Sequence, residues 1–124
     1  MDTFEKFRMM LDQYSSQILK LTSPQAMNAL ELSDALGIPI AACYRRIRAL
    51  KEAGILHEEG KVVSIGGKLV ASYRSSVESA QVMLTDGRLR VVIRTADEKD
   101  SEEMPLSEEA SLLHWAAEID EDEK

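Results

Sequence analysis

The sequence has few of the residues that mark secreted, membrane-bound or catalytic proteins. One cysteine among 124 residues excludes an internal disulfide framework, and aromatic residues make up only 5% of the chain. No apolar run reaches the ~18 residues that a membrane span needs, and the charged start MDTFEKF differs from a signal peptide. These features predict a soluble, cytoplasmic protein whose single domain has a mostly aliphatic core.

Residue patterns for catalysis and for metal binding are also lacking. There is no glycine-rich loop for phosphate and no grouping of serine, histidine and acid that would activate a nucleophile. His57 and His114 lie far apart, and together with Cys43 they lack the spacing of a metal site. We therefore expect no enzyme activity, no cofactor and no metal. His57 is expected to be a structural histidine on a strand.

The acidic net charge of −7 is unevenly distributed. Residues 97–124 hold twelve acidic residues and two lysines, which is 2 − 12 = −10, whereas residues 1–96 carry 13 − 10 = +3. Residues 39–74 alone carry seven Lys or Arg and three Glu, a balance of +4. A phosphate group responds to the local charge, so the middle of the chain remains compatible with nucleic-acid binding.

The stretch from Asn28 to Gly54 predicts two helices joined by a tight turn. Asn28 can cap the first helix with Glu31 bonding back to it, and Gly37 is suited to end that helix. Pro39 is favoured at the first position of the second helix, which we expect over residues 39–53. The buried face of the second helix is predicted to hold Cys43, Ile47 and Leu50.

The other faces of this second helix carry the candidate binding residues. Arg45 and Arg48 point away from the buried face, Tyr44 lies to one side, and the small Ala41 and Ala42 would allow close approach to a surface. Arginine can form two hydrogen bonds to guanine or pair with phosphate, so this pattern favours the major groove of DNA. A solvated helix face, with Glu52 as the partner of Arg48, is the alternative. Arg46, nearer the buried face, is expected to reach around the first helix.

The run LELSDALGIPIAACYRRIRALKEAGIL resembles the winged helix-turn-helix of archaeal and bacterial transcription regulators, particularly the ArsR-like group. The resemblance covers roughly residues 18–75 and implies a homodimer that binds double-stranded DNA. It does not carry over the metal-sensing ligands of that group, because Cys43 falls on the buried face. A buried structural cysteine is the favoured interpretation of Cys43, and redox sensing is the alternative.

Residues 3–21 are predicted to form one N-terminal helix. Its apolar residues are spaced alternately three and four apart, as in a coiled-coil seam. These residues are Phe4, Phe7, Leu11, Tyr14, Ile18 and Leu21. We expect Ile18 and Leu21 in the domain core. The earlier part, from Phe4 to Tyr14, either packs in the same domain or forms a dimer interface.

Two β-hairpins are predicted after the second motif helix. In the first, residues 61–65 and 69–75 flank a two-residue turn at Gly66-Gly67 and form the wing, where Lys61 and Lys68 would contact the DNA backbone. A turn at Glu59-Gly60 is the alternative register. In the second hairpin, residues 77–85 and 88–95 flank Asp86-Gly87, a strong type I′ turn signal.

The C-terminal part is predicted to be a separate acidic unit. Residues 97–104 (DEKDSEEM) are expected to be a solvated linker, and Ser107 caps a last helix that contains the only tryptophan. The predicted fold class is α+β, a winged helix-turn-helix with an N-terminal helix, an additional β-hairpin and a C-terminal helix. The predicted division is residues 1–96 for the DNA-binding domain and residues 97–124 for the acidic segment.

Two functions remain open from the sequence. The first is a homodimeric, sequence-specific transcription regulator that binds double-stranded DNA through residues 39–53 and the wing at residues 61–75. The second is a winged-helix adaptor that binds other proteins and no DNA. In the second case the extra hairpin and the acidic C-terminal segment would be the surfaces for a protein partner.

Overall fold

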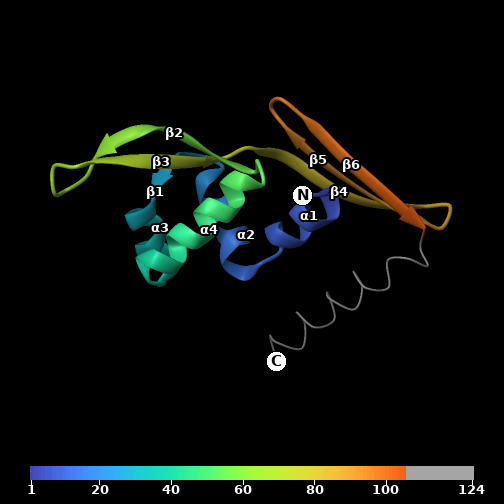
Figure 1. Ribbon diagram of the computed structural model, residues 1–124, viewed down its shortest axis with the longest axis horizontal. Coiled ribbons are helices and arrows are strands. Elements are labelled where there is room, and N and C mark those ends of the chain that lie inside the picture. The colour runs from blue at the N-terminus through green and yellow to red at the C-terminus, as the bar shows by residue number, and fades with distance from the viewer. Residues whose placement is uncertain (106–124) are drawn as a thin grey trace.

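The computed structural model describes residues 1–105, which form an α+β fold with two three-stranded sheets (Figure 1). The elements are α1 (Thr3–Met10), α2 (Gln13–Thr22), β1 (Met27–Asn28), α3 (Ala29–Leu36), α4 (Ile40–Glu52), β2 (Leu56–Val63), β3 (Leu69–Ser75), β4 (Val77–Thr85), β5 (Arg88–Thr95) and β6 (Lys99–Pro105). Figure 1 shows the helices along one side of both sheets, with β3 leading directly into β4. This architecture is the predicted fold class, and it is compatible with a winged helix-turn-helix.

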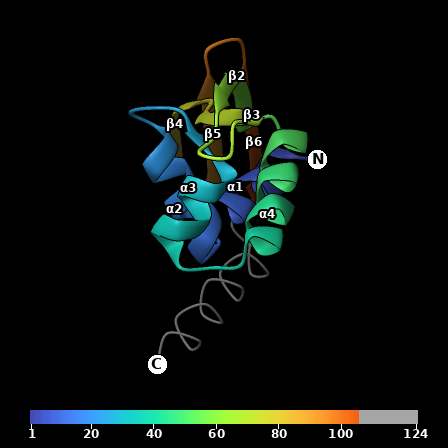
Figure 2. The same cartoon turned by 90° about the vertical axis from the view of Figure 1, so that its left-hand side faces the viewer.

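The first sheet, in the order β1-β3-β2, forms one layer over α2, α3 and α4 (Figure 2). The predicted core residues Ile18 and Leu50 meet there with Leu32 and Ile55, and all four are at most 1% exposed. Met27 belongs to β1, a strand of two residues that pairs with β3 opposite Tyr73. The core therefore fixes three helices against one twisted hairpin, which is how the wing obtains its position.

The N-terminal helix predicted over residues 3–21 is instead two helices, α1 and α2, separated at Leu11 and Asp12. The side chain of Asp12 accepts a hydrogen bond from the backbone N–H of Ser15 at 3.0 Å and so caps α2. An aspartate is a favourable N-cap because its carboxylate satisfies an N–H that has no partner within the helix. The apolar spacing continues through this break, which is why the spacing alone predicted a single helix.

The early part of the apolar seam packs against its own chain. Phe4 is 6% exposed and lies in a second core with Leu89, Val91 and Ile93 of β5. Phe7 and Met10 pack against the same cluster. Phe4 is therefore buried within one chain, and the prediction that it forms a dimer interface is wrong for this residue.

The wing is the β2–β3 hairpin, with a bulge in β2 between Glu58 and Lys61. The alternative turn at Glu59-Gly60 is wrong, because the strand continues through these residues. The turn is near the predicted place, but it is longer than two residues: the N–H of Ser64 donates to the carbonyl of Lys68 at 2.7 Å, and the N–H of Gly67 donates to the carbonyl of Ser64 at 2.9 Å. Gly67 has φ +80°, the left-handed conformation that such a three-residue loop requires.

The second hairpin has the predicted register. Leu84 pairs with Leu89, Val82 with Val91 and Ala80 with Ile93, and the turn residues Asp86 and Gly87 both have positive φ, at 53° and 72°. Positive φ at both central positions defines a type I′ turn. This hairpin forms two strands of the second sheet, whose order is β4-β5-β6.

Residues 97–104 are not a solvated linker, because most of them belong to β6, which pairs with β5 from Arg94↔Lys99 to Arg88↔Pro105. The acidic side chains of β6 find partners on neighbouring elements. Asp100 pairs with Lys6 at 2.6 Å, Glu103 pairs with Arg88 at 2.7 Å, and Glu102 accepts a hydrogen bond from the N–H of Phe4 at 3.1 Å. Two of the five acidic residues in this run are thus ion-paired with α1 and β5.

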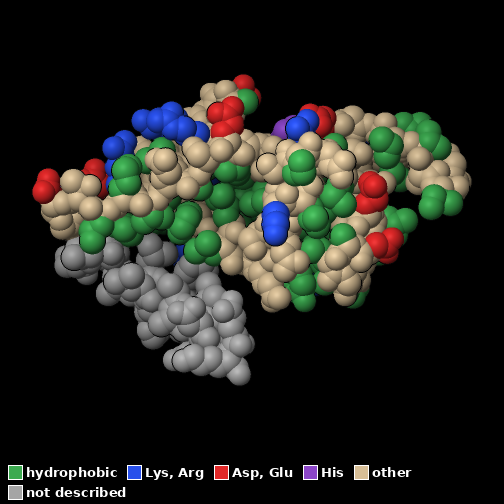
Figure 3. Space-filling view, turned by 180° about the vertical axis from the view of Figure 1, so that it is seen from behind, with side chains coloured by type: hydrophobic (Ala, Val, Ile, Leu, Met, Phe, Trp, Pro, Cys, Tyr) green, Lys and Arg blue, Asp and Glu red, His purple; other side chains and the backbone are tan. Residues whose placement is uncertain are grey.

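The face of the second sheet turned away from α1 is basic. Arg88, Arg90 and Arg94 share this face of β5 with the buried Val92, and these four residues alternate with the residues that pack towards α1. Figure 3 shows Lys and Arg side chains over this part of the molecule. The predicted C-terminal helix lies outside the described residues, and the predicted domain division at residue 96 stays a prediction. None of the helices in residues 1–105 is long and apolar enough to cross a membrane.

Candidate nucleic-acid interface

The turn between α3 and α4 has the predicted local chemistry. The side chain of Asn28 accepts from the N–H of Glu31 at 2.8 Å, and Glu31 accepts from the N–H of Asn28 at 2.9 Å, which forms a capping box. Gly37 ends α3 with φ +67°, and its N–H donates to the carbonyl of Ser33 at 2.9 Å. Ile38 is buried in the turn. The capping box thus defines the start of α3, and the left-handed Gly37 with the buried Ile38 defines the turn into α4.

Helix α4 presents one buried and one exposed face, as predicted. Cys43, Ile47 and Leu50 are at most 2% exposed. Pro39 is the N-cap rather than the first helical residue, so the helix is one residue shorter at each end than predicted. Four of the candidate binding residues on this helix are exposed: Ala41, Tyr44, Arg45 and Arg48. Ala42 is half-buried.

Arg46 has a different role from Arg45 and Arg48. Its Nε lies 3.0 Å from Oδ2 of Asp12, and its guanidinium carbon lies 4.8 Å from the ring centroid of Tyr14. Both contacts are to α2 or its cap, so Arg46 joins α4 to α2, and the prediction that it would reach around the first motif helix, α3, is wrong. A guanidinium fixed between a carboxylate and an aromatic ring is a poor candidate for DNA contact.

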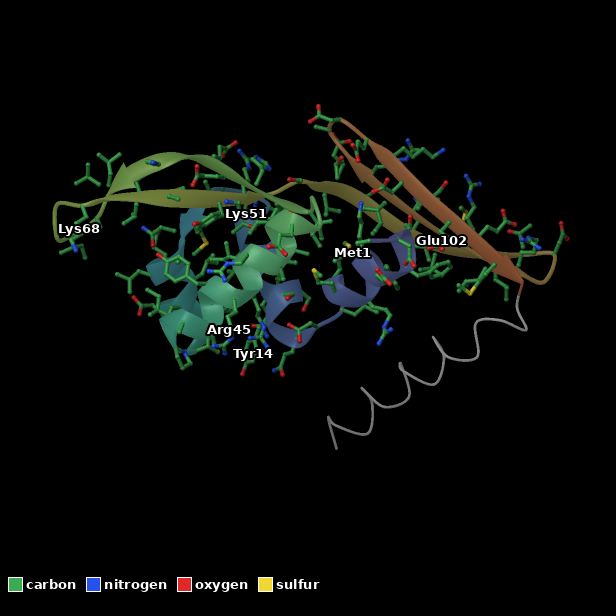
Figure 4. The ribbon with its side chains drawn as sticks, in the orientation of Figure 1. Met1, Tyr14, Arg45, Lys51, Lys68 and Glu102 are labelled. Carbon is green, nitrogen blue, oxygen red and sulfur yellow. The ribbon has the colours of Figure 1, made fainter. Side chains whose placement is uncertain are left out.

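Within residues 1–105, Arg45 and Arg48 have no ion pair, and the alternative pairing of Arg48 with Glu52 is not formed. Figure 4 shows Arg45 on the side of α4 that faces away from the sheet. A solvated guanidinium without a carboxylate partner is available to a phosphate or to a guanine edge. The arrangement therefore provides an unneutralised cationic surface on the second helix of the motif.

A groove of about 360 Å³ borders this surface between α4 and β3. Tyr44, Arg48 and Lys51 lie on its helical side and Tyr73 on its strand side. The Nζ of Lys51 lies 5.7 Å from the ring centroid of Tyr73. The pKa of the Tyr73 hydroxyl is raised, mainly because the side chain is buried. Sequence reasoning missed Lys51 as a candidate, although its place three residues after Arg48 puts both on adjacent turns.

The two wing lysines are exposed, and the structure does not bring them together with the arginines of α4. Lys68 lies at the end of the wing, away from Arg45 (Figure 4). Lys61 lies within β2, opposite Ala71. The wing end also exposes apolar side chains that sequence reasoning did not single out, with Ile65 fully exposed and Val63 and Leu69 more than two-thirds exposed.

Cys43 and His57 each contact other residues of the fold. Cys43 is fully buried and its Sγ lies 3.6 Å from the carbonyl oxygen of Ala29, and burial raises the pKa of its thiol. The Nδ1 of His57 lies 2.7 Å from Oγ of Ser76, where the wing meets the second sheet. Among residues 1–105, no group of three or more His, Cys, Asp or Glu side chains could hold a metal ion.

The segment that contains α2, α3 and α4 also matches a known protein family. Residues 10–59 match the family model of a helix-turn-helix domain. The match begins at the end of α1 and ends in β2, so it includes both motif helices and α2. No curated protein matches the chain. The helix-turn-helix domain suggests DNA-binding regulation, with DNA as a partner.

Proposed function

We propose that this protein is a sequence-specific transcription regulator of the ArsR-like group, acts in the cytoplasm as a homodimer, and has no enzyme activity. In this proposal, α4 enters the major groove and the wing contacts the DNA backbone. The observation that carries the proposal is the pair of exposed arginines, Arg45 and Arg48, which have no ion pair within residues 1–105 and lie on the second helix of a helix-turn-helix domain.

Each contact has a separate proposed role. Arg45 and Arg48 bind guanine edges or phosphates, and Tyr44 adds a contact to phosphate or sugar. The exposed Ala41 and the half-buried Ala42 let the start of α4 approach the bases closely. Lys61 and Lys68 bind phosphates, which sets affinity and salt dependence rather than sequence preference. The balance of +4 over residues 39–74 supports this, because these residues attract phosphate in a chain that is acidic as a whole.

A titration of labelled duplex DNA at low and moderate salt, with the mass of the protein in solution measured alongside, tests the proposal. We expect a dimer whose affinity for random duplex falls steeply as the salt concentration rises. Arg45→Ala and Arg48→Ala should each lower affinity for a selected operator by about tenfold, since each such contact contributes ~1–3 kcal/mol. Arg94→Ala is the matched control, because Arg94 is exposed on the second sheet.

Two outcomes would contradict the proposal. Operator binding by both variants as tight as that of the parent would remove the arginines of α4 from the interface. An absence of binding at low salt would favour the adaptor function, in which the same arginines bind an acidic protein surface.

A further inference from the structure

On the face of the second sheet that packs against α1, the residues of β5 are buried and their neighbours on β4 are exposed. Val91 and Leu89 are 0% and 7% exposed, whereas their direct cross-strand partners Val82 and Leu84 are 47% and 61% exposed. Directly paired residues in an antiparallel sheet lie on the same face. Helix α1 therefore covers the β5 part of this face and leaves Val82 and Leu84, here named the β4 strip, uncovered by residues 1–105.

The chain leaves the sheet at the end of this strip. Pro105, the last described residue, pairs with Arg88, and the preceding Met104 pairs with Leu89, which itself pairs with Leu84. Neighbouring strands are ~4.8 Å apart, so residue 106 begins about 10 Å, or two strand spacings, from the row of Leu84. Figure 3 shows hydrophobic side chains exposed along this side of the second sheet.

Residues 106–124 have the length and the composition to cover the strip. They number 19, and their apolar residues Leu112, Trp115 and Ile119 recur three and four positions apart, the spacing of one helix face. A helix of that length would extend ~28 Å, and the strip from Val82 to Leu84 extends only ~7 Å. Seven acidic residues occupy the remaining positions and would stay in water.

We propose that residues 106–124 dock through their apolar side chains on the β4 strip of the same chain, beside α1. This inference does not depend on DNA binding. The competing location is the opposite face of the sheet, where Arg90 and Arg94 would attract the acidic residues. Docking there would place these apolar side chains beside the two arginines and Met83, whereas the β4 strip offers two adjacent exposed apolar residues, Val82 and Leu84.

Trp115 is the only tryptophan, so its fluorescence reports the environment of this segment in the intact protein. We expect a blue-shifted emission and weak acrylamide quenching compared with the denatured protein. Leu84→Asp and Val82→Asp should each shift the docked population by roughly tenfold or more and raise quenching towards the denatured value. Both side chains are exposed in residues 1–105, so the fold should persist, which circular dichroism would verify.

Leu69→Asp is the matched control, because Leu69 is 68% exposed on the wing, and it should leave the fluorescence unchanged. The inference is overturned by Trp115 quenching in the parent that equals quenching in denaturant, or by quenching that Leu84→Asp does not alter. If Arg90→Glu or Arg94→Glu instead increased the quenching of Trp115, the segment would lie on the basic face. Protection that is lost on dilution would assign the segment to a second copy.

Discussion

The Nε atom of Arg46 lies 3.0 Å from Oδ2 of Asp12, and this contact joins α4 to the N-terminus of α2. Asp12 also accepts the N–H of Ser15, so one carboxylate serves both as a helix cap and as an anchor for α4. Partial burial acts to raise the pKa of Asp12, but these two hydrogen bonds outweigh it and the pKa is lowered. This contact therefore anchors one side of α4 to α2, while Arg45 and Arg48 stay exposed on the helix.

Asp12→Ala should reduce the free energy of unfolding by about 1 kcal/mol at neutral pH, the usual cost of losing a helix cap. Because the folded pKa of Asp12 is lowered, its contribution is complete above the unfolded pKa of about 3.9 and is lost as the pH falls through the folded pKa. Denaturant titrations across this pH range measure the difference between variant and parent. Asp34→Ala, an exposed site on α3, is the control, and a difference that does not shrink at acidic pH would contradict the assignment.

Lys68→Ala should weaken binding equally for all DNA sequences and reduce the slope of log affinity against log salt by about 1, because one phosphate contact is lost. The measurement is a salt titration with an operator and with a random duplex. Arg94→Ala should change neither slope. A selective loss for the operator would show instead that the end of the wing reads bases.

Gly67→Ala should loosen the end of the wing, because Gly67 has φ +80° and an L side chain is strained there by ~1 kcal/mol or more. The added Cβ meets no atom within 4 Å, so conformational strain is the only cost. Hydrogen exchange of the Ser64 amide, which donates to Lys68, should speed up about fivefold. Gly66→Ala is a neighbouring control without positive φ, and equal exchange in both variants would contradict the loop geometry.

Cys43 should react with a thiol reagent only when the domain opens. The side chain is 0% exposed and its thiol pKa is raised by burial, so little thiolate reaches the solvent at pH 8. Ser16→Cys adds an exposed thiol to the same molecule as an internal control. In this variant we expect one thiol to react fast and the other slowly, with rate constants that differ by roughly a thousandfold or more. A single fast equivalent in the parent would show that Cys43 is accessible and would favour redox sensing.

Local signals predicted the motif and the second hairpin well. The capping box of Asn28 and Glu31, the left-handed Gly37 and the type I′ turn at Asp86-Gly87 are all confirmed. Each depends on the conformational preferences of residues that are at most four positions apart. For the same reason the buried face of α4 could be predicted, since helical spacing alone decides which residues share it.

The errors lie where distant segments compete with a local pattern. The seam over residues 3–21 continues across Asp12, but Phe4 of α1 packs in the second core with β5 whereas Ile18 of α2 packs in the first core. Two distant partners therefore share one continuous local pattern. The acidic residues 97–104 read as a linker because their partners Lys6 and Arg88 come from elsewhere in the chain. Hydrogen bonding to the open edge of β5 then stabilises a strand that its own charge would disfavour.

The sequence by itself determined the α+β fold class, the helix-turn-helix segment and the exposure of Arg45 and Arg48, because these follow from spacing and short-range hydrogen bonds. Tertiary structure alone decided that Arg46 is used internally, that Lys51 borders the groove beside Tyr73, and that α1 covers the second sheet. Those outcomes depend on which distant group comes within bonding distance, and no local pattern in the chain encodes that distance.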